Sequence, residues 1–209
     1  PILKTNIPMW QGGGIAGREA ADIAFTMNRY LRLRRNMGKD TYCLFLDAVQ
    51  AYDLIDRPLL LTCLEKFGFD KQAIQWIKSF HEGGFNGTNI NGITVEAPST
   101  LGIPQGSPIS PALYVIWHFI CTETYDNIYK LPRMLMETLH DEVITHPRAK
   151  LGDKKSNTIV MDIGLLAYVD DTTIMCEDRD SVVLHARQWI AHNEKFSSKI
   201  HTTGKSNLL

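Results

Sequence analysis

Two adjacent carboxylates, Asp170 and Asp171, lie between two short apolar runs, and this arrangement restricts the fold more than any other feature of the sequence. The runs IGLLAYV and TTIMC have the length and composition of buried strands, which predicts the acidic pair at a hairpin tip or a strand end. Adjacent carboxylates repel each other, and beside an apolar sheet one of them tends to hold a proton. The pair is therefore either a solvated polar turn or a site that holds a cation.

Composition and charge narrow the class of protein. The chain has 209 residues and a formal net charge of −1, which predicts one globular domain with at most a small additional lobe. No overall positive field attracts it to nucleic acid, although local patches can carry such contacts. None of the four cysteines forms a C-x-x-C pair, so free, buried and reduced thiols are expected, as in an intracellular protein of the nucleus or cytoplasm.

Neither a membrane span nor a targeting segment is visible. The longest apolar-rich stretch, residues 112–121, is too short to cross a bilayer, so no contact with a membrane is expected. The chain does not begin with Met, and we expect it to be a fragment of a longer protein.

Hydrophobic periodicity and turn residues predict an α+β fold with a mostly antiparallel sheet packed on helices. Asp56, Pro58 and Gly68 have the positions of a helix start and exit, and the Asn-Gly pair at 91–92 predicts a hairpin. Helices are expected over 17–38, 56–69, 70–83, from near 107–111 to 129, and over 181–196; strands over 41–48, 88–97, 163–169 and 172–176; and an exposed loop over 140–157.

A third carboxylate, Asp47, ends the apolar run CLFL. If its strand neighbours the hairpin, Asp47, Asp170 and also Asp171 would converge, and three carboxylates need a counter-charge. A pair of Mg²⁺ ions would supply it, because Mg²⁺ takes oxygen ligands and substrate phosphates. Two such ions, about 4 Å apart, can hold the attacking and leaving oxygens of phosphoryl transfer. The spacing thus favours a phosphoryl- or nucleotidyl-transfer site.

Two further segments bear on this interpretation. Tyr52, five residues beyond Asp47, is either a half-buried core ring or the floor under a sugar. In LGIPQGSPISP, Gly102 and Gly106 allow the backbone to approach a ligand closely, and Gln105 offers a donor and an acceptor. The same segment can equally be a plain loop before a capped helix.

Taken together, the segments resemble the palm of a reverse transcriptase, most closely the LINE-type (non-LTR) retrotransposon and group II intron branch. FLDAVQAYD resembles motif A, GIPQGSPISP resembles motif B, and AYVDD resembles motif C. The upstream QGGGIAGREAADIAF resembles the block Q-x-GFRxGRST-x-D, and FSSKIHTTGKSNLL resembles motif D. The resemblance implies an RNA-directed DNA polymerase that acts on an RNA template, a DNA primer and dNTPs.

The resemblance implies catalytic roles for matching positions. Asp47 and Asp170 would bind two Mg²⁺ ions, with Mn²⁺ as a substitute, and the carbonyl of Ala48 would be a further ligand. Asp171 would complete the acidic group. Lys205 matches the motif D lysine and would protonate the leaving pyrophosphate.

It also implies substrate contacts. Tyr52 would crowd a ribose 2′-OH and so favour dNTPs, while Gln105 and Gly106 would contact the incoming nucleotide and the template side. Arg18 matches an arginine for which a template or triphosphate contact is plausible, but the Ser-Thr that usually follows is Glu19-Ala20 here, so Glu19 could pair with Arg18 instead.

In domain terms, residues 1–40 would be part of the fingers and 41–209 the palm. The arginine-bearing R-P-I-S block of the fingers and the thumb would belong to the missing parts of the parent chain. Motif D departs from the family pattern, with His201 where Asn is usual and Ser198 where Gly is usual.

Other candidates are weaker. The basic segment over 29–35 is either a solvated helix face or a phosphate contact, the histidines show no zinc-ligand spacing, and Trp10, Trp76, Trp117 and Trp189 are expected in the core. Two alternative functions stay open: an inactive or domesticated fragment that only binds nucleic acid or protein, and a nucleotidyl transferase with an RNA product. Tyr52 opposes the second, because an enzyme that uses NTPs needs room for the 2′-OH.

Overall fold

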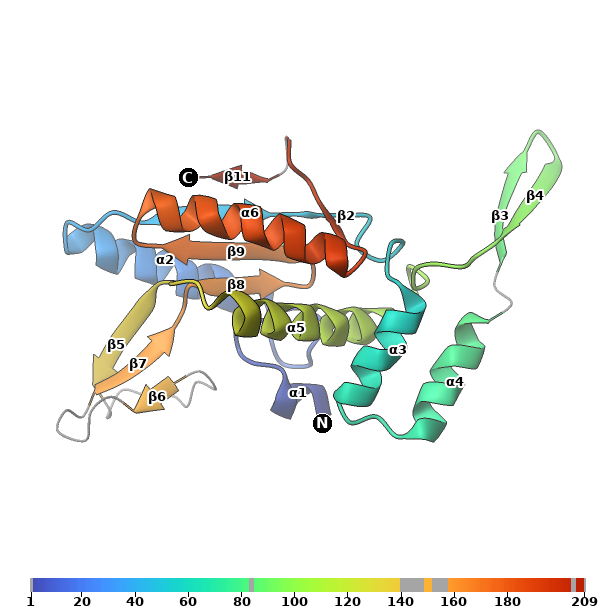
Figure 1. The fold of residues 1–209 in the computed structure, drawn as a ribbon, viewed down its shortest axis with the longest axis horizontal. Helices are drawn as coiled ribbons and strands as arrows, with labels where there is room; N and C mark the ends of the chain where they lie inside the picture. Colours follow the sequence, from blue (N-terminus) through green and yellow to red (C-terminus); the bar gives the residue numbers. More distant parts are fainter. Residues whose placement is uncertain (1, 83–84, 140–148, 152–157, 204–205, 209) are drawn as a thin grey trace.

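A computed structural model of the chain describes residues 2–82, 85–139, 149–151, 158–203 and 206–208. Helices and antiparallel strands alternate irregularly, which confirms the predicted α+β class (Figure 1). The helices are α1 Ile2–Asn6, α2 Ala20–Asn36, α3 Arg57–Lys66, α4 Lys71–His81, α5 Ser110–Tyr129 and α6 Arg179–Lys195. The strands are β1 Tyr42–Leu46, β2 Ala48–Val49, β3 Phe85–Ile90, β4 Ile93–Pro98, β5 Leu135–Leu139, β6 Ala149–Leu151, β7 Thr158–Asp162, β8 Leu165–Tyr168, β9 Asp171–Cys176, β10 Lys199–Ile200 and β11 Asn207–Leu208.

The central sheet has the strand order β11-β1-β9-β8, and all its neighbours are antiparallel. The short strands β10 and β2 pair separately beside it. The segment before α2 adds one parallel bridge to its edge, between Gln11 and Ala167. The β8–β9 hairpin that carries the two aspartates therefore lies in the same sheet as the strand that leads to Asp47.

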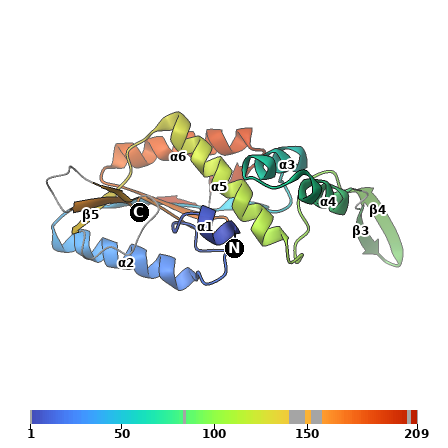
Figure 2. The same cartoon turned by 90° about the horizontal axis from the view of Figure 1, so that it is seen from below.

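Helices cover both faces of this sheet. Figure 2 shows α2 on one side of the strands and α5 and α6 on the other. The outer end of the molecule is formed by α3, α4 and the projecting β3–β4 hairpin (Figure 1). This layering buries β1 on both faces and leaves the end of the β8–β9 hairpin next to the start of α5.

Side-chain alternation in β1 explains why its sequence is apolar throughout. Leu44 and Leu46 pack with Trp189 in the cluster under α5 and α6, whereas Cys43 packs with Tyr30 in the cluster under α2. A strand that contributes to two cores needs apolar residues on both faces. The expected double burial is confirmed.

Local signals for the helix ends are confirmed as well. The Asp56 carboxylate accepts from the Leu59 N–H at 2.8 Å and caps α3. The chain leaves α3 through Gly68, whose φ of +96° suits glycine. Asp70 caps α4 in the same way through the Ala73 N–H.

The Asn-Gly pair also has the conformation that its sequence predicts. Asn91 and Gly92 both have positive φ, 53° and 85°, between the paired residues Ile90 and Ile93. Positive φ at both loop positions is the requirement of a type I′ hairpin turn. The predicted hairpin is confirmed.

Two expectations are wrong. Strand β6 lies inside the stretch 140–157 that was expected to be a loop, because its three residues pair with β7 without an apolar pattern of their own. Trp76 is 58 % exposed and stacks on Phe80, with ring centroids 5.8 Å apart, instead of entering the core. In the basic segment, Arg29, Arg32 and Arg35 are exposed, whereas Arg34 is buried and pairs with Glu177 at 2.9 Å.

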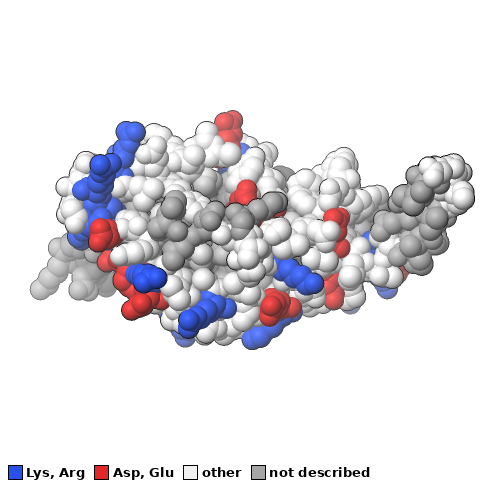
Figure 3. Space-filling model, turned by 90° about the horizontal axis from the view of Figure 1, so that it is seen from above, with Lys and Arg blue, Asp and Glu red and all other residues white. Residues whose placement is uncertain are grey.

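The four cysteines are free and buried, as predicted. Within the described part of the chain, no helix is both long and apolar enough to cross a membrane. Lys and Arg side chains alternate with Asp and Glu over the face in Figure 3, with basic side chains gathered at its left end. This mixture agrees with the near-zero net charge of the sequence.

Candidate active site

The acidic pair lies at the tip of a tight hairpin, as predicted. Tyr168 of β8 pairs with Asp171 of β9, which leaves only Val169 and Asp170 in the loop between them. Val169 has a φ of +58°. Positive φ at the first of two loop residues is a position that II′ turns usually give to glycine. Asp170 thus occupies the tip, and Asp171 begins the returning strand.

Asp47 is brought to the same end of the sheet by strand pairing. In the β1–β9 ladder, Leu46 lies opposite Thr172. Asp47 is the next residue after Leu46, and Asp171 is the residue before Thr172, so both carboxylates belong to this end of the ladder. The expectation that the acidic segments follow neighbouring strands therefore agrees with this register.

The C-terminal segment contacts Asp47. Its backbone N–H donates to the Ser206 hydroxyl at 3.3 Å, and its carbonyl accepts from the His201 N–H at 2.9 Å. The His201 Nε2 lies 3.6 Å from the Asp47 carboxylate. Sequence reasoning noted His201 only as a departure from motif D. Its contact with Asp47 depends on the pairing of β10 with β2, which no local pattern indicates.

Two tyrosine rings form an apolar wall near Asp170. Tyr52 and Tyr114 are stacked, with ring centroids 5.2 Å apart. Burial raises the pKa of Tyr52, and the negative charge of Asp170 raises it further. The pKa of the fully buried Tyr114 is also raised, by burial first and then by Asp170. Both phenols therefore stay neutral and lie within the field of the hairpin carboxylate.

Tyr114 was not identified from the sequence. It lies on α5, four residues after Ser110 at the helix start, and is 1 % exposed. The signal that could have found it is this position: a ring one turn into the helix that follows the Gly- and Pro-rich loop.

The glycine-rich loop before α5 rests on the turn that carries Tyr52. Ile103 N–H donates to the Tyr52 carbonyl at 2.9 Å. At Gly102, φ is +76°, and an added Cβ would lie 2.6 Å from the Asp53 carbonyl oxygen, so only glycine fits. Beyond it, the Gln105 side-chain amide donates to both carboxylate oxygens of Asp53, at 3.1 and 3.0 Å. The predicted motif A and motif B segments are therefore in direct contact.

Arg57 holds the preceding part of this loop in place. Its guanidinium donates to the carbonyls of Gly102 at 2.7 Å, Leu101 at 2.9 Å and His81 at 3.0 Å, and also to the Ser99 carbonyl. A planar guanidinium with five N–H donors can fix several carbonyls at once. The loop is thereby attached to both α3 and α4.

Arg18 has an environment that its sequence did not predict. It donates to the backbone carbonyls of Ile7 at 2.7 Å, Pro8 at 2.6 Å and Gln11 at 3.0 Å. These bonds fold the segment before α2 around its side chain. Its contact with substrate stays a prediction, and Lys205 lies outside the described residues.

Glu19 takes part in the start of α2. Its backbone N–H donates to the Asp22 carboxylate at 2.9 Å, one half of a capping box. The start of this helix, and with it the segment around Arg18, is fixed by local hydrogen bonds.

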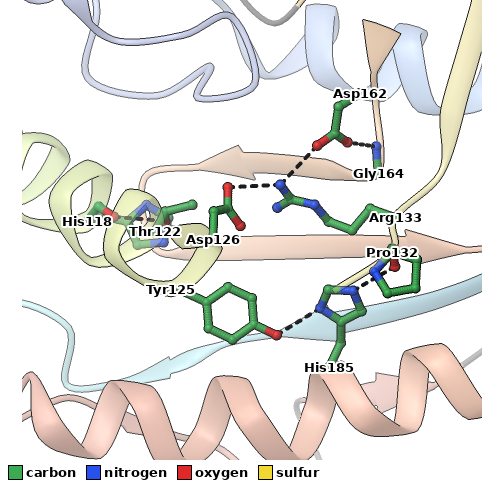
Figure 4. A network of polar contacts seen from close by, with 9 residues as sticks. All are labelled: His118, Thr122, Tyr125, Asp126, Pro132, Arg133, Asp162, Gly164 and His185. Atoms are coloured by element: carbon green, nitrogen blue, oxygen red, sulfur yellow. Dashed lines mark hydrogen bonds and ion pairs between the residues drawn. The ribbon is translucent and has the colours of Figure 1, made fainter. Parts of the chain in front are cut away.

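A polar network around the buried Arg133 side chain lies at the start of β8, at the end of the β8–β9 hairpin opposite the acidic tip (Figure 4). The Arg133 guanidinium donates to Asp126 of α5 at 2.8 Å and to Asp162 of β7 at 2.9 Å. Asp162 in turn accepts from the Gly164 N–H at 2.9 Å, just before β8. Burial tends to lower the pKa of Arg133, but the two aspartates outweigh it and the net pKa is raised, so the ion pairs persist.

The donors at this edge of the sheet are hard oxygens. Among the described residues, no three His, Cys, Asp or Glu side chains gather closely enough to hold a metal ion, so the expected three-carboxylate cluster does not appear there. Mg²⁺ is commonly bound by one or two carboxylates completed by water and substrate phosphates. Asp47, Asp170 and the carbonyl of Ala48 have the oxygen ligands that such an open, substrate-completed site uses.

Comparison with known proteins gives one family and several relatives. The family model for reverse transcriptase (RNA-dependent DNA polymerase) matches residues 2–204. The chain is 27 % identical over 158 residues to the retrovirus-related Pol polyprotein from type-1 retrotransposable element R2 of Popillia japonica, over 74 % of this chain and 22 % of that protein. It is 25 % identical over 180 residues to the transposon TX1 uncharacterized 149 kDa protein of Xenopus laevis, over 85 % of this chain and 12 % of that protein. The chain thus spans less than a quarter of either relative.

Solved structures of telomerase share the fold. Apo telomerase from Candida tropicalis, truncated from its C-terminal domain, aligns with 100 % of this chain and 38 % of its own, at a TM-score of 0.62 and 14 % identity. Telomerase from Candida albicans, in complex with a TWJ fragment of telomeric RNA, aligns with 99 % of this chain and 32 % of its own, at a TM-score of 0.56 and 11 % identity. At such identities the likeness concerns the fold alone.

Proposed function

The chain belongs to the reverse transcriptase family, and we propose that it forms the catalytic core of an RNA-directed DNA polymerase from a retroelement. The family match and the two retroelement relatives confirm the resemblance to non-LTR reverse transcriptases that the motifs predict. The reaction is transfer of a nucleotide from a dNTP to a primer 3′-OH on an RNA template. The observation that supports this proposal is the β1–β9 pairing, whose last pair, Leu46 and Thr172, comes one residue before Asp47 and one residue after Asp171.

In this proposal Asp47, Asp170 and the carbonyl of Ala48 hold two Mg²⁺ ions, or Mn²⁺ in their place. When bound, the ions supply charge neutralisation for the attacking and leaving oxygens of phosphoryl transfer. Asp171 adds negative charge at the first residue of β9 and so favours cations at the tip. Asp47 directly follows β1 and Asp170 directly precedes β9, so both carboxylates are attached to the sheet by short connections, which favours a preorganised site.

Tyr52 selects the sugar in this proposal. Its ring is half buried and rests on Tyr114, so the larger part of its position is set by packing. A ring held this way cannot easily move aside for an additional 2′-OH. This supports dNTPs as substrates and argues against a nucleotidyl transferase that makes RNA.

Further residues have proposed roles at the same site. Gln105 and Gly106 contact the incoming nucleotide and the template side, and the Asp53 pair holds the Gln105 amide until substrate binds. Lys205 protonates the leaving pyrophosphate. Arg18 contacts the template or triphosphate in addition to its backbone bonds. Residues 1–40 belong to the fingers and 41–209 to the palm.

The test is primer extension with an RNA template, a DNA primer, dNTPs and Mg²⁺, using the longer protein that carries this chain. Wild type should extend the primer and Asp170→Asn should not, while circular dichroism shows the same fold for both. Asp180→Asn, an exposed carboxylate in the first turn of α6, is the matched control and should extend normally. Extension by Asp170→Asn at the wild-type rate contradicts the proposal. Nucleic-acid binding without extension by wild type would instead favour the inactive, binding-only alternative.

A further inference from the structure

The side chain of Gln11 is hydrogen-bonded to the backbone of the β8–β9 hairpin loop. Its Oε1 accepts from the Val169 N–H at 2.8 Å, and its Nε2 donates to the Val169 carbonyl at 3.0 Å. The side-chain amide therefore forms hydrogen bonds with both the N–H and the carbonyl of Val169, as the backbone of a neighbouring strand would. Gln11 is 0 % exposed, so water does not compete for these bonds.

Val169, the loop residue that Gln11 contacts, has a backbone conformation that must be stabilised by its surroundings. Val169 is β-branched and has a φ of +58°, a region that such residues rarely adopt and that costs free energy. A residue in this state persists only when its surroundings determine it. Asp170 follows directly, so any relaxation of Val169 would turn the Asp170 carboxylate away from its present direction.

The backbone around Gln11 is shaped for this contact. Gly13 N–H donates to the same Oε1 at 2.9 Å, and an added Cβ on Gly13 would lie 2.5 Å from the Val169 nitrogen. Trp10 and Gly12 bond to the backbone of Ala167 on β8 at 2.7 and 2.8 Å. Residues 10–13 thus run alongside β8, the edge strand of the sheet, and are hydrogen-bonded to it.

A buried histidine, His118, connects Gln11 to β9, the other strand of the hairpin. His118 Nδ1 lies 3.5 Å from Gln11 Nε2, and His118 Nε2 lies 3.1 Å from the Thr172 hydroxyl. Since the Gln11 Oε1 accepts from two N–H groups, its Nε2 is the donor, so Nδ1 is the acceptor and Nε2 carries the proton. The network therefore contacts the residues on both sides of the Asp170-Asp171 pair.

We propose that Gln11 is a positioning residue that holds Val169 in its strained conformation and thereby sets the direction of the Asp170 carboxylate. This inference rests on the proposed polymerase function for its consequence, but the hold on the loop is a property of the chain by itself. His118 supports Gln11 from α5.

The test is a double-variant cycle of Gln11→Met and Val169→Gly in the longer protein that carries this chain. Methionine keeps the volume of Gln11 but cannot bond to the loop. A glycine in place of Val169 adopts positive φ without strain, so the loop should no longer need support. Without metal, Gln11→Met should lower Tm less in the wild-type background, where relaxation of the strained Val169 offsets part of the lost hydrogen bonding, than in the Val169→Gly background, where there is no strain to release. In primer extension, Gln11→Met should raise the Mg²⁺ concentration for half-maximal rate by about tenfold or more, and Val169→Gly should restore most of it.

Asn193→Leu is the matched control, because Asn193 is a buried amide on α6 that donates to the Trp189 carbonyl, away from the hairpin. It should lower Tm equally in both backgrounds and leave the Mg²⁺ requirement unchanged. Additive Tm changes for Gln11→Met and Val169→Gly would overturn the hold on the loop. An unchanged Mg²⁺ requirement in an active Gln11→Met enzyme would overturn the positioning role. If wild type extends no primer, the proposed function fails, and the Tm cycle still decides whether Gln11 holds Val169.

Discussion

Acid should destabilise this protein in part through one buried histidine, His118. It is 3 % exposed and packed against the rings of Trp10, Tyr114 and Trp189. Burial lowers its pKa from 6.5 to about 4. The folded protein therefore keeps this imidazole neutral at pH values where the unfolded chain protonates it.

The sign and size of the effect follow from linkage. Between pH 6.5 and 4 the unfolded state binds a proton at this position that the folded state does not, so stability is complete above pH 6.5 and falls as the pH is lowered. Below pH 4 both states are protonated and the loss stops growing. A pKa difference of about 2.5, at roughly 1.36 kcal/mol for each unit, gives a loss of about 3 kcal/mol.

The assay is urea unfolding of wild type and His118→Gln between about pH 7.5 and about pH 4, the range that the lowered pKa sets. Burial also lowers the pKa values of His185 and His192, but these residues are present in both proteins, so their contribution cancels in the difference. The free-energy difference between the two proteins should shrink or reverse by about 3 kcal/mol as the pH falls. A difference that stays constant across this range would refute a neutral, buried His118.

Two further predictions concern the site and its support. Tyr52→Val should raise ribonucleotide incorporation relative to dNTP incorporation in a single-nucleotide assay. Because the ring is half buried, the substitution should lower the unfolding free energy by only about 1–2 kcal/mol. Unchanged sugar selectivity would show that Tyr52 is a core residue only. Arg133→Met should lower the unfolding free energy by about 3 kcal/mol, because Asp126 and Asp162 would face each other without their shared cation; a loss well under about 1 kcal/mol in urea unfolding would contradict the role of this network.

Much of the fold could be predicted because its signals are local. The apolar run of β1, the Asn-Gly turn and the caps Asp56 and Asp70 each act within a few residues, and the structure has them where the sequence predicts. The neighbouring placement of Asp47 and the acidic hairpin was also predicted, since both end strands of one sheet.

Contacts between distant segments could not be predicted. Gln11 reaches a loop 158 residues away in the chain, and its amide has no local pattern that distinguishes it from an exposed glutamine. Arg18 bonds to carbonyls whose direction depends on a fold of the preceding segment. The prediction that Trp76 lies in the core was wrong for a related reason: helical periodicity indicates which residues share a face but not whether another element covers that face.

We propose that Asp47 and Asp170 together hold the catalytic metal ions. Mn²⁺ binding, followed by electron paramagnetic resonance in a complex with RNA template, DNA primer and a non-reactive nucleotide, tests it most directly. The double variant Asp47→Asn/Asp170→Asn should bind Mn²⁺ at least about tenfold more weakly than wild type, while still binding the primer-template. Mn²⁺ binding by the double variant as tight as that of wild type would contradict the claim.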